Sequence, residues 1–178
     1  YQDPKAFRSS QASATKGRDG CRVPLPWDST DCRFTGNGQF DIEGSFGFSP
    51  SVKADGSQPD APHLPQPRWF RDFAVDVESD DPSSMLSLYR NAIALRRRLI
   101  SSDTSLEWLS CDELEGSGFE AEQIDGVIAF SRVRHWVCMT NFNETPVPLV
   151  KGRLLLSSFP LTEDDLLPAD ATVWIQTQ

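Results

Sequence analysis

The pattern of apolar and polar positions changes along the chain, and its most regular part predicts a helix over residues 83–100. Apolar side chains recur there at helical spacing on one face, and only Arg96 interrupts that face. They are Met85, Leu88, Tyr89, Ala92, Ile93, Leu99 and Ile100. Asp81-Pro82-Ser83 supplies a start signal, because a capping side chain and a proline favour a first turn. The basic residues 96–98 complement the helix dipole, and a basic binding patch is the alternative interpretation.

From residue 105 the pattern alternates with a period of two, which predicts short β-strands. The candidate strands are residues 105–109, 127–132, 135–141, 147–150, 153–157 and 172–176. We expect no helix between them, and short strands joined by turns are typical of an antiparallel β-sandwich. The C-terminal part, residues 104–178, is therefore predicted to form such a domain.

Residues 1–82 show no sustained period and are rich in turn residues, so this part is predicted to be mostly loop. A structureless loop of this length is not expected inside a self-contained domain. Phe34, Phe40, Phe46 and Phe48 are spaced through it, whereas disordered segments are poor in aromatic residues. We therefore expect the loop to wrap over a body that this sequence does not contain.

The charge of the chain limits the classes of partner. Its 178 residues include 26 acidic and 17 basic side chains, which gives a net charge of −9. Nucleic acid is not expected as a partner, because binding to phosphates needs a cationic surface. No apolar run approaches a membrane span, and the first residues lack the pattern of a secretory signal. The absence of an initiating Met suggests a chain cut from a longer one.

The cysteines and histidines do not indicate a metal site. The four cysteines and two histidines show no ligand spacing, so we expect neither a metal nor another cofactor. Cys21 and Cys32 would form a disulfide only in an oxidising compartment. Without a secretory signal we favour free thiols and a cytoplasmic location. The sequence does not determine the oligomeric state.

The segment KGRDGCRVPLPW, residues 16–27, combines charged, turn-forming and apolar side chains. Its two prolines fix φ and exclude a helix, and its glycines allow a tight turn that directs Arg18 and Asp19. Trp27 ends the segment as a large apolar anchor. A rigid loop with directed charges is typical of a binding site. A solvated turn followed by a buried tryptophan is the structural alternative.

No group of residues forms a complete active site. The sequence has neither a Gly-x-Ser-x-Gly nucleophile segment nor a glycine-rich phosphate loop. Acidic residues cluster in four places, and a pair of carboxylates is what a glycosidase uses. The clusters are Asp28/Asp31, Asp41/Glu43, Asp112/Glu113/Glu115 and Glu163/Asp164/Asp165. All of them lie in predicted loops or at polar strand ends, so solvated surface is the favoured interpretation.

Several segments, taken in order, resemble one enzyme family. KGRDGCRVPLPW is followed by GFSPS at 47–51, LPQPRWF at 64–70 and DPSSMLSLYRNAIALRRRL at 81–99. Together they resemble the C-terminal third of α-glucosidases of the α-amylase superfamily, in the bacterial maltase and oligosaccharide α-glucosidase branch. The segments at 124–149 and 171–176 resemble strands of that family's C-terminal β-sandwich domain.

This resemblance implies a mainly β chain, with a C-terminal antiparallel β-sandwich preceded by the last loop and outer helix of an incomplete (β/α)8 barrel. Residues 1–103 would be the end of the catalytic barrel, with a substrate-side loop at 1–82. Arg18 would bind the sugar, Asp19 and Arg22 would hold the loop in shape, and Trp27 would pack beneath it.

The resemblance also implies a function in a longer enzyme, because the family's catalytic carboxylate motifs do not occur here. The chain would be a C-terminal fragment, or a degenerate relative, of a retaining α-glucosidase that acts on α-glucosides or oligosaccharides. Alone it would be inactive. The alternative is a non-catalytic β-sandwich module that binds glycan or protein, with Trp136 or Trp174 in contact with a glycan.

Overall fold

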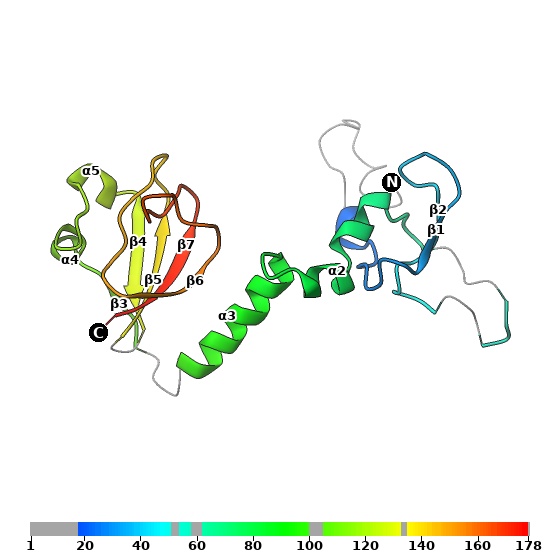
Figure 1. The fold of residues 1–178 in the computed structure, drawn as a ribbon, viewed down its shortest axis with the longest axis horizontal. Helices are drawn as coiled ribbons and strands as arrows, with labels where there is room; N and C mark the ends of the chain where they lie inside the picture. Colours follow the sequence, from blue (N-terminus) through cyan, green and yellow to red (C-terminus); the bar gives the residue numbers. More distant parts are fainter. Residues whose placement is uncertain (1–17, 51–53, 58–61, 100–104, 133–134, 178) are drawn as a thin grey trace. The chain divides into compact units, whose positions relative to one another are not determined.

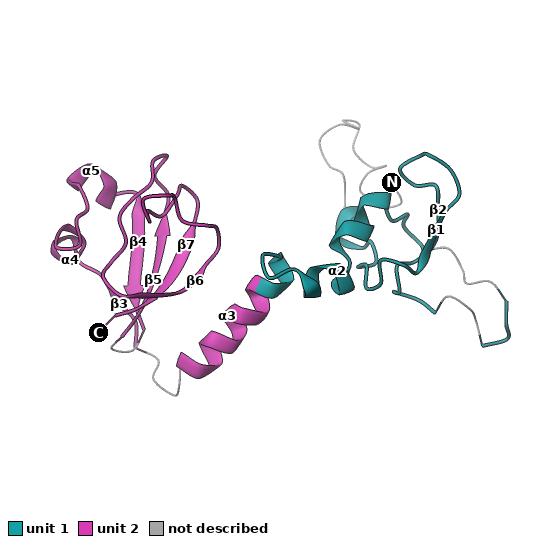
Figure 2. Cartoon of the chain, in the orientation of Figure 1, with its two compact units in different colours: residues 1–87 teal, residues 88–178 magenta. Residues whose placement is uncertain are grey.

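The computed structural model of the chain describes residues 18–50, 54–57, 62–99, 105–132 and 135–177. It divides into two compact units, residues 1–87 and residues 88–178 (Figure 1, Figure 2). We refer to them as unit 1 and unit 2. The division falls inside the predicted helix, whereas the boundary predicted at residue 103 lies outside the described residues. That boundary stays a prediction.

Unit 1 is built from short elements that the prediction of loop over residues 1–82 missed. They are η1 (Asp19–Cys21), β1 (Cys32–Phe34), β2 (Ile42–Gly44), η2 (Arg68–Phe73) and α2 (Val75–Asp80). β1 and β2 form a two-stranded antiparallel sheet in which Arg33 lies opposite Glu43 and forms an ion pair with it. None of these elements exceeds six residues, which is too short to establish a period in the sequence.

Phe46 forms the interior of unit 1. Its side chain is fully buried, and its carbonyl accepts the backbone N–H groups of Trp27 at 2.6 Å and Asp28 at 2.9 Å. Phe40 and Phe48 are more than half exposed, at 53% and 54%. The phenylalanines expected to cover a missing body are therefore divided, because Phe46 is used inside unit 1 itself.

The predicted helix is confirmed as α3 (Met85–Leu99), and residue 100 lies outside the described residues. Ser84 caps it, because the Ser84 hydroxyl accepts the backbone N–H of Ser87 at 3.1 Å. Asp81 instead closes the turn before the helix by accepting the N–H of Ser83 at 2.8 Å. No residue of α3 is buried.

Unit 2 contains a five-stranded sheet in the order β3-β4-β5-β7-β6, with every neighbouring pair antiparallel (Figure 1). The strands are β3 (Glu107–Trp108), β4 (Val127–Ser131), β5 (Trp136–Asn141), β6 (Arg153–Ser157) and β7 (Thr172–Gln176). This confirms the predicted fold class, a mainly β chain whose C-terminal part is antiparallel. The strand expected at 147–150 is absent, because Pro146 and Pro148 provide no N–H and Val147 makes only an isolated bridge to Leu167.

Two short helices interrupt the strands, contrary to the prediction of no helix there. α4 (Cys111–Glu115) and α5 (Ala121–Ile124) lie between β3 and β4 (Figure 1). Each begins with a capping box, made by Ser110 and Glu113 for α4 and by Glu120 and Gln123 for α5. Helices of five and four residues are too short to show a period, so the capping signature was their only sequence signal.

The hydrophobic core of unit 2 lies on one face of the sheet. Alternate residues of β5 and β7 are buried there, and side chains from α4, the following turn and the later loops pack on them. The cluster contains Leu114, Phe119, Ala129, Val137, Met139, Val147, Val150, Leu167, Ala171, Val173 and Ile175. We call this side of the sheet the covered face.

Asn141, at the end of β5, connects the sheet to the loops that cover it. The residue is fully buried, and its Nδ2 donates to the carbonyls of Thr145 at 2.9 Å, Leu167 at 3.1 Å and Pro168 at 3.1 Å. Its Oδ1 accepts the backbone N–H of Asn143 at 2.8 Å. Because a buried amide is stable only when it is hydrogen-bonded, this network determines where the two loops cross the core.

Candidate functional site

The candidate site is the loop that begins at Arg18, the sugar-binding residue predicted from the sequence. Residues 16 and 17 of the segment lie outside the described residues. Arg18 is exposed and immediately precedes η1, where its carbonyl accepts the N–H of Cys21 at 3.1 Å. The single turn of η1 therefore fixes the backbone from which the Arg18 guanidinium extends.

Asp19 and Arg22, the residues predicted to hold the loop in shape, lie at opposite levels of this turn. Asp19 is buried, with 9% of its surface exposed, whereas Arg22 is exposed. The Arg22 N–H donates to the Asp19 carbonyl at 3.0 Å and closes the turn. Asp19 is therefore placed to act within the loop, and Arg18 and Arg22 are presented on its surface.

The rest of the loop is held by backbone contacts to distant parts of unit 1. The Pro24 carbonyl accepts the side-chain N–H of Gln66 at 2.9 Å, and Gln66 itself is 1% exposed. The carbonyls of Pro26 and Trp27 accept the N–H groups of Val75 at 3.3 Å and Asp76 at 3.2 Å, at the start of α2. Sequence reasoning did not identify Gln66, whose only signal was a glutamine between two prolines.

The indole of Trp27 is placed differently from the expectation of a packed anchor. Half of the residue is exposed, at 51%, and the neighbouring Leu25 is 66% exposed. The anchoring at this position comes from the Trp27 backbone, which donates to Phe46 and accepts from Asp76. A buried backbone bonded on both sides can hold a loop without burying the side chain.

Asp76 connects the far end of the loop to α2. Its carboxylate accepts the Ser29 N–H at 3.0 Å and the Ser29 hydroxyl at 2.7 Å. Burial raises the pKa of Asp76, but the hydrogen bonds from Ser29 outweigh it and lower the pKa overall. Hydrogen bonds from Thr30 likewise hold the pKa of Asp28 below its usual value. These carboxylates therefore serve the loop as ionised acceptors.

The acidic clusters show no sign of a general acid in the described ranges. A general acid at neutral pH needs a raised pKa, and every resolved shift of an aspartate or glutamate is downward. Among the same residues, no group of three His, Cys, Asp or Glu side chains could hold a metal ion. All four cysteines are free. The described residues can therefore bind and orient a ligand, but they do not assemble acid–base chemistry.

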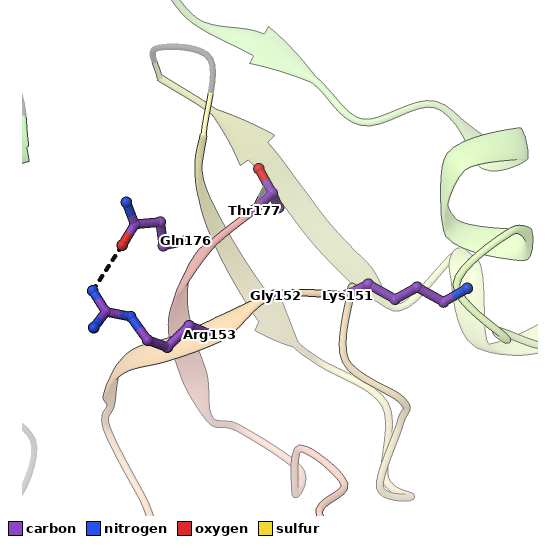
Figure 3. Close-up of a pocket in the computed structure, with 5 residues that line it drawn as sticks. All are labelled: Lys151, Gly152, Arg153, Gln176 and Thr177. Carbon is purple, nitrogen blue, oxygen red and sulfur yellow. Dashed lines mark hydrogen bonds between the residues drawn. The ribbon is translucent and has the colours of Figure 1, made fainter.

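A pocket lies in unit 2, at the edge of β6 and β7 (Figure 3). It has a volume of about 1020 Å³ and is lined by Lys151, Gly152, Arg153, Gln176 and Thr177. Arg153 donates to the Gln176 side chain at 2.8 Å, and the Lys151 side chain extends in the opposite direction from that of Arg153 (Figure 3). The two cations do not converge on one point, and the lining has no nucleophile–base pair.

Comparisons with known proteins identify the fold. No family profile and no curated protein matches the sequence. The chain aligns over 90% of its length with a trehalulose synthase at 18% identity and a TM-score of 0.53. It aligns over 92% with a trehalose-6-phosphate hydrolase of Bacillus licheniformis at 16% identity and a TM-score of 0.52. A variant of that hydrolase aligns over 100%, with 16% identity and a TM-score of 0.58.

The chain spans only a part of these solved structures, namely 26%, 27% and 32% of their lengths. At this level of identity the likeness shows the fold and not the activity. The structure contains no helix, within the residues it describes, that is long and apolar enough to cross a membrane.

Proposed function

We propose that this chain is the C-terminal part, or a degenerate relative, of a retaining α-glucosidase that hydrolyses terminal α-linked glucose from oligosaccharides. The observation that carries this proposal is the fold similarity of at least 90% of the chain to enzymes named for trehalulose and trehalose 6-phosphate. Trehalose is a disaccharide of α-linked glucose, so these names favour an α-glucoside as substrate. The proposal places the protein in the cytoplasm, where free thiols persist.

In this proposal Arg18 binds the sugar. Its guanidinium presents donors in a planar fork that suits sugar hydroxyls and a neighbouring carboxylate. η1 and the contacts of Pro24, Pro26 and Trp27 hold the loop, which lowers the entropy cost of orienting the guanidinium. Asp19 and Arg22 stabilise the turn, and the Trp27 backbone secures its far end.

The chemistry itself is assigned to residues outside this sequence. A retaining glycosidase needs a carboxylate nucleophile and a carboxylic acid with a raised pKa on either side of the scissile bond. The lowered pKa values of Asp28 and Asp76 make these two residues unsuitable as the acid. The role left for this chain is to orient the substrate and to complete the enzyme structurally.

The test uses the gene product that contains this sequence in its natural reading frame, assayed on p-nitrophenyl α-glucoside. Arg18→Ala should lower kcat/KM by about 10- to 100-fold, because a positioned charged hydrogen bond is worth about 1.5–3 kcal/mol. Arg33→Ala is the matched control, since Arg33 is an exposed arginine paired with Glu43 in β1. Equal effects of the two substitutions would reject the role of Arg18.

The same experiment tests the fragment assignment. We expect the isolated chain to show no turnover and the longer gene product to carry the catalytic carboxylates upstream of this sequence. Turnover by the repurified chain alone, or a reading frame that begins at this sequence, would contradict the proposal.

A second candidate is a non-catalytic module that binds glycan or protein, and the exposed aromatic side chains of unit 2 favour it. Trp136 is 4% exposed and unavailable to a glycan, so Trp108, at 66%, is the better candidate contact. Calorimetric titration of the chain with maltose and soluble starch tests this candidate. Binding that is lost in Trp108→Ala would favour a glycan module.

A further inference from the structure

The sheet of unit 2 has a second apolar face. An antiparallel sheet with one face in water normally alternates apolar and polar residues, whereas a sheet buried on both faces reads as continuous apolar runs. β4 reads VIAFS, β5 begins WVCM and β7 contains VWI. The sequence of the strands is therefore that of a sheet with two covered faces, although the core lies on only one of them.

The side chains of this second face, which we call the open face, are aligned in register. Trp108 pairs with Phe130, Phe130 with Cys138, and Cys138 with Trp174 across β3, β4, β5 and β7. Directly paired residues of an antiparallel sheet share one face, so these residues form a continuous row. Trp108 remains 66% exposed, and Ile128, two residues before Phe130 in β4, is 46% exposed.

The open face contains no charged residue in its central part. Next to the aromatic row lie Ile128, Thr140 and Thr172, which are paired in register, and the two threonine hydroxyls hydrogen-bond at 2.8 Å. Arg153 lies at the end of the sheet opposite Gln176. An apolar centre free of charge in a chain of net charge −9 is typical of the buried core of a protein interface.

The aromatic rings interlock and do not form a flat platform. Trp108 meets Phe130 at 78° and Trp136 meets Trp174 at 82°, with ring centroids 5.7 Å and 5.0 Å apart. A polysaccharide that lies on a sheet needs coplanar rings, whereas edge-to-face rings are typical of packed protein interiors. The indole N–H of Trp136 is buried and finds no acceptor among the described residues. An acceptor from a covering protein layer would satisfy it.

We propose that the open face is covered by the catalytic body that precedes this sequence on the same polypeptide. This inference rests on the proposed function and adds the surface through which the two parts associate. The solved structures with this fold are about three to four times longer than the part this chain matches, since it spans 26% to 32% of them. A body of that size is large enough to provide the second layer that a two-faced sheet needs.

The test is hydroxyl-radical footprinting of Trp108, read by mass spectrometry, in the isolated chain and in the full gene product. Phe159 is the internal control, because it is 65% exposed and lies outside the sheet. Complete burial in an interface should lower the labelling rate of Trp108 by about tenfold in the full product. The rate of Phe159 should change by less than about twofold, as expected for a side chain outside the interface core.

A double variant of the full gene product, Trp108→Lys with Ile128→Lys, provides the second measurement. Both residues are exposed in unit 2, so the isolated chain should keep its unfolding midpoint. The full product should become cleavable by trypsin between its two parts, and Phe159→Lys should not have this effect.

Equal labelling of Trp108 in both proteins would overturn the proposal. Protection that appears in the isolated chain with rising concentration would assign the open face to a second copy, and protection by soluble starch would assign it to a glycan. Either result would also overturn the proposal. The assay on p-nitrophenyl α-glucoside separates the two claims: protection without turnover rejects only the proposed function, and turnover without protection rejects only the covered face.

Discussion

At the scale of the residue, Asn141 shows how one buried polar side chain organises a loop-rich domain. The strand pattern of β5 would be satisfied by any apolar residue at this inward position. An amide is used because three carbonyls from two separate loops converge there, and each needs a donor. Asn141 therefore determines the position of loops whose own sequences contain no regular element.

We expect Asn141→Ala to lower the free energy of unfolding of unit 2 by about 3 kcal/mol, because it leaves buried carbonyls without a donor. Urea denaturation followed by circular dichroism measures the change. Asn91→Ala is the matched control, since Asn91 is exposed on α3 and its substitution should change the free energy by less than about 0.5 kcal/mol. A loss below that value for Asn141→Ala would show that the amide network is not needed.

At the scale of the element, local polar signals and not hydrophobic periodicity determine the short helices. α4 spans five residues and contributes one core side chain, Leu114. Its start is fixed by Ser110, whose hydroxyl accepts the Glu113 N–H at 3.3 Å, while the Glu113 carboxylate accepts the Ser110 N–H at 2.8 Å. This reciprocal pair brings Leu114 onto the covered face at one end of the sheet.

The capping box should make the stability of unit 2 depend on pH. Hydrogen bonds from the Ser110 backbone and hydroxyl lower the pKa of Glu113 below its ordinary value of 4.5. The carboxylate therefore stabilises the fold fully above about pH 4.5, and this contribution is lost as the pH falls through the lower pKa of the folded state.

We expect Glu113→Gln to reduce the loss of stability between pH 7 and pH 3, relative to the unsubstituted chain. Urea denaturation at the two pH values measures this difference. Glu115→Gln is the control, because Glu115 lies in the same helix and its carboxylate has no hydrogen bond among the described residues. If both substitutions flatten the pH dependence equally, the effect does not come from the cap.

At the scale of the whole molecule, the two units differ in how they are stabilised. Unit 2 has a contiguous cluster of buried apolar side chains on one face of its sheet. In the described part of unit 1, the buried apolar residues are Phe46, Leu64 and Ala74, and the irregular segments are held mainly by backbone hydrogen bonds. Apolar burial is the dominant stabilising contribution, so unit 1 should be the less stable.

We expect the isolated chain to unfold in two steps, with unit 1 first. Hydrogen exchange read by mass spectrometry should show the backbone around Trp27 and Phe46 exchanging at lower urea concentration than that of β5 and β7. A single transition shared by peptides from both units would contradict this expectation, because it would require the units to unfold cooperatively.

The sequence by itself determined the elements whose signal is local and repeated. The amphipathic period identified α3, and the alternation of β4, β5, β6 and β7 identified the antiparallel strands of a mainly β chain. The directed loop around Arg18 was also recognisable from its glycines and prolines, because these residues restrict the backbone without help from the rest of the fold.

Only the tertiary structure decided the features that depend on contacts between distant residues. The sequence gives no sign that Gln66 and Asp76 hold the Arg18 loop, that Phe46 is inside while Trp27 is half exposed, or that prolines reduce a predicted strand to one bridge. The open face follows the same rule. Apolar runs indicate burial, but the register between strands decides which side chains share a face, and register is set by pairing across the sheet.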